Sequence, residues 1–135
     1  DLLTHKIFGI NRFDIVIVRG EAIKENYDVV KRVVGLPNDT LRYEDGILYI
    51  NDEPVEESFI SDDIKLKTSN ISEIKLKDNE YYVLGDNREI SKDSRDFGII
   101  KKDDIIGRGL LKYLTLVKEN NKVVDFRFYF PFVVK

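Results

Sequence analysis

The chain has 135 residues, of which 42% are apolar and 35% charged, a size and composition typical of one domain with a hydrophobic core. Its formal net charge of −3 argues against nucleic acid as a partner, because nucleic-acid binding requires a basic surface. The absence of cysteine excludes disulfides, a thiolate nucleophile and cysteine-based metal sites. The single histidine, His5, has no pattern of partners around it, so we expect no metal and no cofactor.

Most of the chain has the pattern of short β-strands separated by turns, which is typical of an all-β protein. Apolar runs rich in β-branched and aromatic residues are bounded by Gly, Pro, Asn and Asp, and Asp45-Gly46 is a strong hairpin signal. We expect strands at residues 15–18, 29–34, 41–43, 47–50, 71–76 and 81–84, two around a bend within 99–108, and a pair at 110–118 and 122–130. The predicted fold is a single, mostly antiparallel, folded-sheet or barrel-like domain over residues 1–135, with a C-terminal β-hairpin extension.

Two polar segments separate the predicted strands. Residues 21–28 form a short connection with room for one helical turn. Residues 55–70 are acidic and polar, with isolated apolar residues at Ile60, Ile64 and Leu66. We expect the 55–70 segment to be the most loop-like part of the chain and the part that varies or moves most.

Lys31 is the first candidate for chemistry. Side chains alternate along a strand, so Lys31 shares one face with Val29 and Val33, while Arg32 points to the other face. Loss of hydration disfavours the charged ammonium, and a neutral lysine can accept a proton as a general base. The alternative is a lysine whose stem crosses apolar surroundings while its charged end reaches water. The residues alone leave both interpretations open.

The second candidate is the polar loop between Gly85 and Gly98, which follows the predicted strand at 81–84. Ser91 could orient a neutral amine, or it could make a local turn hydrogen bond. The loop also mixes acids and bases, which suggests fixed ion pairs because Arg binds carboxylates with two parallel hydrogen bonds. If these pairs are exposed they contribute little. The charged residues concerned are Asp86, Arg88, Asp93 and Arg95.

Residues 30–39, Val-Lys-Arg-Val-Val-Gly-Leu-Pro-Asn-Asp, followed by the 85–98 loop, resemble motifs of the bacterial type I signal peptidases. That family consists of membrane-anchored serine proteases with a Ser-Lys dyad. Shorter agreements lie at residues 13–16, 81–87 and 105–108. Phe13 stands where the family's strand motif usually has glycine. The similarity extends from about Asp1 to Leu116, and two long motifs in the right order make it specific.

The resemblance implies a role for each matched position. Lys31 is expected to be the general base that activates the nucleophile, and Ser91 to hydrogen-bond Lys31 and aim it. Ion pairs that brace the site are expected from Arg32, Asp86, Asp93 and Arg95. We expect Asp28, Val29 and Val30 to pair with the backbone of the signal peptide, which would bind as an added extended strand.

The resemblance also implies a serine nucleophile in a Ser-Met-X-Pro motif ahead of Leu2-Leu3, and this chain lacks that motif. Residues 1–6 are typical of the middle of a strand, so we expect a missing segment before Asp1 and an inactive chain as given. The expected activity is cleavage of preprotein signal peptides. The expected location is the extracytoplasmic face of the cytoplasmic membrane, with the domain held by an N-terminal anchor outside this sequence.

Two other functions remain open at this point. One is a catalytically inactive homologue that acts as a binding or assembly factor for secreted or pilin-like proteins. The other is a different Ser-Lys protein, such as a self-cleaving repressor domain, which the match of the 85–98 loop disfavours.

Overall fold

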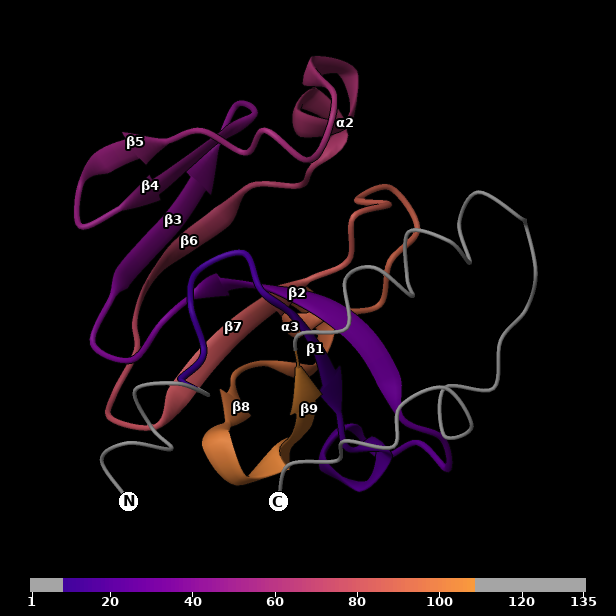
Figure 1. Cartoon of the computed structure of the whole chain (residues 1–135). Coiled ribbons are helices and arrows are strands. Elements are labelled where there is room, and N and C mark those ends of the chain that lie inside the picture. The colour runs from indigo at the N-terminus through magenta and orange to yellow at the C-terminus, as the bar shows by residue number, and fades with distance from the viewer. Residues whose placement is uncertain (1–8, 109–135) are drawn as a thin grey trace.

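The computed structural model describes residues 9–108, which form two antiparallel β-sheets and a few short helical segments (Figure 1). The strands are β1 (Ile15–Val18), β2 (Val29–Gly35), β3 (Thr40–Glu44), β4 (Ile47–Ile50), β5 (Glu53–Val55), β6 (Ile71–Lys75), β7 (Glu80–Leu84), β8 (Ile100–Lys101) and β9 (Ile105–Arg108). The helices are α2 (Asp62–Lys67) and α3 (Ser94–Phe97), with 3-10 turns η1 (Gly20–Ile23) and η2 (Lys102–Asp104). The larger sheet has five strands in the order β8-β7-β2-β1-β9, and the smaller has four in the order β5-β4-β3-β6.

The predicted mostly antiparallel β-fold is confirmed, and every predicted strand between residues 15 and 108 is present. Asp45 and Gly46, with φ angles of 51° and 84°, form the predicted hairpin turn between β3 and β4. The described strands form two sheets and no closed barrel, which corresponds to the folded-sheet form of the expectation. The predicted C-terminal strand pair at 110–118 and 122–130 lies outside the described residues.

The 55–70 segment is more regular than the sequence predicted. It begins at the end of β5 and contains α2, whose first turn is capped by Ser61 because the serine Oγ accepts the Ile64 N–H at 3.3 Å. Asp62 and Asp63 follow in the first turn, where negative charge complements the helix dipole. These capping residues outweigh the low apolar content that favoured a loop.

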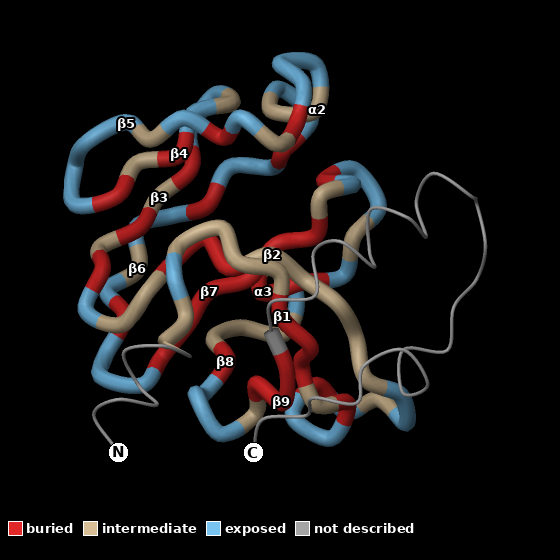
Figure 2. Tube along the Cα trace, viewed as in Figure 1, coloured by how far each residue is buried: buried red, intermediate tan, exposed pale blue. Residues whose placement is uncertain are grey.

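Apolar residues from both faces of β2 and β7 fill two core clusters. One cluster lies between the sheets and includes Val34 and Leu84 of the larger sheet with Leu41 and Leu48 of the smaller. The other cluster packs against the far face of the larger sheet and includes Val33. Figure 2 shows the result along β7, which is buried over its whole length.

The register of β2 and β7 determines where the site forms. Arg32 lies opposite Leu84 and Val33 opposite Val83, so Lys31 comes beside Gly85, where the chain leaves β7 for the polar loop. Residues 29–31 of β2 continue past this point. Among the described strands, only β1 pairs with them, so their other edge has no strand partner within residues 9–108.

Candidate active site

Lys31 and Ser91 are brought together. The Nζ of Lys31 donates a hydrogen bond to the Oγ of Ser91 at 3.0 Å. Lys31 is half-buried, and this burial lowers its pKa below the ordinary value. The negative charge of Asp93 opposes the shift and the positive charge of Arg95 adds to it. A lysine with a lowered pKa beside a hydroxyl that can orient it is a chemically competent general base.

Gly85 makes room for this contact. A Cβ atom at residue 85 would lie 1.9 Å from the Oγ of Ser91 and 2.4 Å from its Cβ. The same atom would lie 3.5 Å from the Nζ of Lys31. No side chain fits here unless Ser91 moves, so glycine at this position permits the approach of Ser91 to Lys31.

Asp93 is fully buried and holds the loop from the inside. Its carboxylate accepts hydrogen bonds from the Nε and NH2 groups of Arg95, both at 2.9 Å, and from the Gly85 N–H at 3.0 Å. Burial by itself would raise the pKa of Asp93, but the hydrogen bonds from Arg95 and Gly85 outweigh it and lower that pKa. Asp93 is therefore an anion that fixes both Arg95 and the start of the loop.

Arg32 and Asp86, two of the predicted bracing residues, form a second ion pair. The Nε and NH2 groups of Arg32 donate to the two carboxylate oxygens of Asp86 at 2.9 and 2.8 Å. The remaining NH1 group donates to the Phe13 carbonyl at 2.9 Å, and the guanidinium lies 4.0 Å from the ring centroid of Phe59. All four predicted bracing residues thus form ion pairs at the loop.

The predicted substrate-binding residues lie at the open end of β2. The Oδ1 of Asp28 accepts the Gly20 N–H at 2.9 Å, so its carboxylate holds the turn before the strand. Val29 and Val30 belong to β2 and pair with β1. Nothing in the structure tests a substrate role for these three residues, and it stays a prediction.

Ser94 is the other serine of the loop and, unlike Ser91, it is buried. The residue is 3% exposed, and its Oγ accepts the Val83 N–H at 2.9 Å. This hydrogen bond ties the start of α3 to β7. Ser94 therefore acts as a structural link between the loop and the sheet.

Sequence reasoning missed three residues that contact the loop from the smaller sheet and the 55–70 segment. Tyr43, Glu57 and Thr68 surround the buried side chain of Arg88. Glu57 stands in an acidic stretch that resembles solvated surface, and no local signal distinguishes it from its exposed neighbour Glu56. Only the folded arrangement shows that one of the two adjacent carboxylates is buried.

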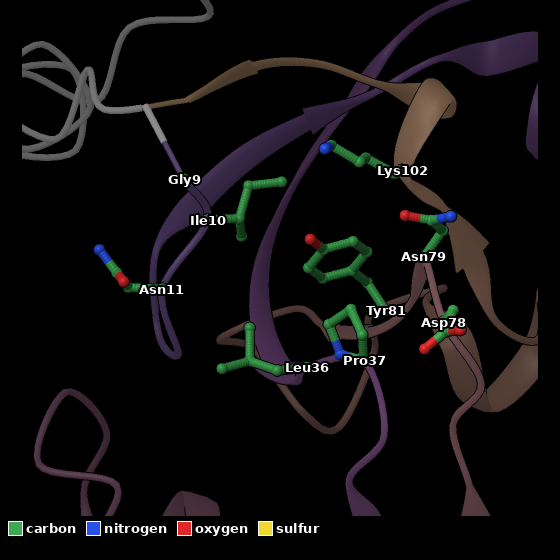
Figure 3. Close-up of a pocket in the computed structure, with 9 residues that line it drawn as sticks. All are labelled: Gly9, Ile10, Asn11, Leu36, Pro37, Asp78, Asn79, Tyr81 and Lys102. Carbon is green, nitrogen blue, oxygen red and sulfur yellow. The ribbon is translucent and has the colours of Figure 1, made fainter. Parts of the chain in front are cut away.

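A pocket of about 720 Å³ lies elsewhere on the larger sheet (Figure 3). It is lined by residues 9–11, 36–37 and 78–79, together with Tyr81 and Lys102. Neither Lys31 nor Ser91 lines it, and Tyr81 stands near the start of β7, whereas Lys31 lies near its end. The pocket is thus separate from the Lys31–Ser91 pair. Within residues 9–108, no helix has the length and apolar character needed to cross a membrane.

Comparisons with known proteins find one family throughout. The family model described as "Signal peptidase, peptidase S26" matches residues 2–114. Signal peptidase IB of Staphylococcus aureus strain Mu50 is 32% identical over 123 residues, which cover 80% of this chain and 63% of that protein. Signal peptidase I V of Bacillus subtilis strain 168 is 36% identical over 115 residues, which cover 77% of this chain and 67% of that protein.

A solved structure is also similar to this one. The crystal structure of a signal peptidase I from Enterococcus faecalis V583 matches with a TM-score of 0.66 and 30% sequence identity. The match covers 74% of this chain and 96% of the crystallised one. Against the Staphylococcus aureus relatives, the present chain spans less than two thirds of their length.

Proposed function

This chain belongs to the signal peptidase family, peptidase S26, and from that premise we propose that it is part of an endopeptidase that cleaves signal peptides from exported preproteins. The observation that carries this proposal is the 3.0 Å contact between the Lys31 Nζ and the Ser91 Oγ at a half-buried site. Family membership supports the reaction class, and the contact supports Lys31 as the base.

In the proposed mechanism a serine hydroxyl attacks the carbonyl carbon of the scissile peptide bond. The neutral amine of Lys31 takes the hydroxyl proton and later gives it to the departing amine of the mature protein. Water then hydrolyses the acyl-enzyme ester and regenerates the serine. Ser91 holds the Lys31 amine in place during both proton transfers.

The nucleophile of this mechanism is a serine that the resemblance places in a Ser-Met-X-Pro motif. The 135 residues contain no methionine, so this motif is not among them. Reading the sequence encoded before Asp1 tests whether the nucleophilic serine is present. A serine in that motif supports the proposal, and any other residue at that position favours a catalytically inactive homologue that binds secreted or pilin-like proteins.

The substrate is proposed to bind as an extended strand along the open edge of β2. Residues 29–31 offer backbone groups there, and Asp28 stands at the start of this edge. An added strand gains affinity from main-chain hydrogen bonds and selectivity from pockets for alternate side chains. A signal peptide bound in this way places its cleavage point near Lys31. The domain is proposed to act on the extracytoplasmic face of the cytoplasmic membrane, held by an N-terminal anchor.

The test is preprotein cleavage by the protein as encoded, with Lys31→Ala and the matched control Lys101→Ala. Lys101 lies on β8 and pairs with Glu80, away from the site. We expect Lys31→Ala to lower the cleavage rate by about 100-fold or more, because general-base catalysis contributes at least that much. We expect Lys101→Ala to cleave at the wild-type rate, with circular dichroism showing both variants folded. Unchanged cleavage by Lys31→Ala would exclude Lys31 as the base.

A further inference from the structure

Like Asp93, Arg88 is a buried charged residue of the polar loop. Its side chain is 0% exposed, and that of its partner Glu57 is 1% exposed. The NH2 group of Arg88 donates to the Oε2 of Glu57 at 2.5 Å, and the NH1 group donates to the Oε1 at 3.3 Å. Burial of a charge requires this kind of pairing, because an unpaired ion inside a protein is strongly unfavourable.

Two neutral hydroxyls complete the surroundings of the pair. Tyr43 of β3 donates to the Oε1 of Glu57 at 2.6 Å, and the Oγ1 of Thr68, after α2, accepts from Arg88 at 3.4 Å. Burial, with the neighbouring Glu57, raises the pKa of Tyr43 to about 12, so the phenol stays protonated and donates. The smaller sheet and the 55–70 segment thus both contribute side chains that contact Arg88 of the polar loop.

The opposite end of this guanidinium reaches the site. The Nε of Arg88 donates to the carbonyl of Gly85 at 2.9 Å, while the N–H of Gly85 donates to Asp93. Both backbone groups of Gly85 are therefore fixed by buried charged side chains. Gly85 is the residue whose lack of a side chain lets Ser91 approach Lys31.

We propose that Arg88 is a positioning residue: held by Glu57, it fixes the Gly85 carbonyl and through it the Ser91–Lys31 pair. The inference rests on the proposed function, because it takes Lys31 as the base. It gives the 55–70 segment a role that its polar sequence did not indicate. That segment supports the catalytic loop from outside the larger sheet.

The other contacts between the 55–70 segment and the polar loop are weaker. Lys67 of α2 lies 3.7 Å from Glu89, and both side chains are about half or more exposed, so solvent screens the pair. The NH1 group of Arg95 donates to the Oγ of Ser69 at 3.2 Å in an exposed position. The buried Arg88–Glu57 pair is therefore the contact through which the 55–70 segment can fix the position of Gly85.

The first test is Arg88→Lys in the 135-residue chain, with Arg42→Lys as the matched control. Lysine keeps the positive charge beside Glu57 but has no donor at the place of the arginine Nε, so the Gly85 carbonyl loses its partner. Arg42 pairs with Asp52 on the surface of the smaller sheet, and its side chain makes none of the loop contacts described above. The measurement is the pH midpoint of Lys31 acetylation by acetic anhydride, followed by mass spectrometry.

We expect the midpoint of Lys31 to move upward in Arg88→Lys, because a looser loop admits water to the amine and reduces the effect of burial. A shift that lowers the free-amine fraction at neutral pH about threefold, which is roughly half a pH unit, supports the proposal. Arg42→Lys should leave the midpoint unchanged. An unchanged midpoint in folded Arg88→Lys overturns the proposal.

A second variant covers the case in which Arg88→Lys does not fold. The double variant Glu57→Leu with Arg88→Met removes both charges together, and such replacements of buried ion pairs are often neutral for stability. The same upward shift is expected, because the Gly85 carbonyl again has no partner. A folded double variant with an unchanged midpoint overturns the proposal, and so does failure of both variants to fold, which would show a purely structural role.

These outcomes are distinguishable from failure of the proposed function. Acetylation needs no nucleophile and no substrate, so the Arg88 variants report only on the position of Lys31. If the acetylation midpoint of Lys31 in the wild-type chain equals that of an ordinary lysine, the result counts against Lys31 as the general base. A lowered wild-type midpoint that the Arg88 variants leave unchanged would count against the positioning role alone.

Discussion

The Nζ of Lys31 lies 3.0 Å from the Oγ of Ser91, although 60 residues separate them in the chain. Pairing of β2 with β7 brings Lys31 to the point where the polar loop begins, and Gly85 leaves the space that Ser91 occupies. Lys31 is thus desolvated by the strand it belongs to and oriented by a loop that buried ion pairs hold in shape.

Replacement of Lys31 by methionine tests this desolvation through stability. The pKa of Lys31 is lowered in the folded protein, so between the folded and unfolded pKa values the unfolded chain binds more protons. The free energy of unfolding therefore rises with pH across that range. Below it, the folded protein carries the full cost of burying the charged Lys31 amine. We expect Lys31→Met to have a higher free energy of unfolding than wild type at pH 7, with the difference shrinking toward pH 10.5.

Urea denaturation at several pH values measures the difference between Lys31→Met and wild type. Lys101→Met on β8 is the control, since Lys101 is 58% exposed and pairs with Glu80 at the sheet surface. A loss of stability in Lys31→Met that does not depend on pH would show that the amine is not held in a desolvating position.

Local signals in the sequence predicted most of the fold. Asp45-Gly46 predicted the turn between β3 and β4, and the β-branched runs predicted β1 and β2. Turn and strand propensities of this kind depend on neighbouring residues, so they can be read from the sequence. Asn38, which follows Pro37, adopts φ of 70°, a turn conformation that Asn tolerates. The capped helix α2 was missed because a six-residue helix with no buried residue leaves no apolar periodicity.

The site could be predicted only in part. Lys31 between valines allowed both a buried base and a solvated end, and the resemblance to a family, rather than the pattern, favoured the first. The contacts of Glu57 and Phe59 with the loop and β2 could not be predicted, because they join distant segments. Their polar neighbourhood at 55–70 is typical of surface loop, which is what most such residues form.

Gly85→Ala tests whether space at residue 85 is required. An alanine Cβ would overlap Ser91, so Ser91 must move and Lys31 loses its hydrogen bond. We expect preprotein cleavage by the encoded protein to fall about 100-fold, the scale of a misplacement of about 1 Å at a catalytic group. Gly107→Ala is the control, because its Cβ would come nearest to the Cδ1 end of the Ile17 side chain, at 3.1 Å. Wild-type cleavage by Gly85→Ala would refute the packing argument.

Asp93→Asn tests the buried ion pair with Arg95. The variant leaves the largely buried guanidinium without its counter-charge, so we expect a loss of about 3–5 kcal/mol in the free energy of unfolding at pH 7. The folded pKa of Asp93 is lowered, so its contribution is present above its ordinary value of 3.8 and is lost as the pH falls through the folded value.

Denaturant unfolding at pH 7 and pH 3 checks this pH dependence. Wild type should lose more stability between the two pH values than Asp93→Asn, which has no carboxylate to protonate. The control Asp62→Asn alters a side chain that is 95% exposed and should follow wild type. Equal slopes for wild type and Asp93→Asn would mean that the pair contributes nothing through charge.

Phe13 provides a test of backbone strain beside the site. Its φ of 72° is unusual for a bulky residue, and its ring lies 4.9 Å from that of Phe59. Phe13→Gly and Phe13→Ala both remove the ring contact, but only alanine keeps a Cβ in the left-handed region. We expect Phe13→Gly to be more stable than Phe13→Ala by about 1 kcal/mol in urea denaturation. An alanine variant of equal or greater stability would show that residue 13 is not strained.

The pKa of Lys31 in the wild-type chain tests the central claim most directly. Competitive acetylation across a range of pH, with each lysine quantified by mass spectrometry, gives the titration of Lys31 beside that of Lys92 in one sample. Burial lowers the pKa of Lys31, whereas the hydrogen bond to Glu25 raises that of Lys92. We predict that Lys31 titrates below 10.5 and below Lys92. Titration of Lys31 at or above 10.5 would contradict its role as the base.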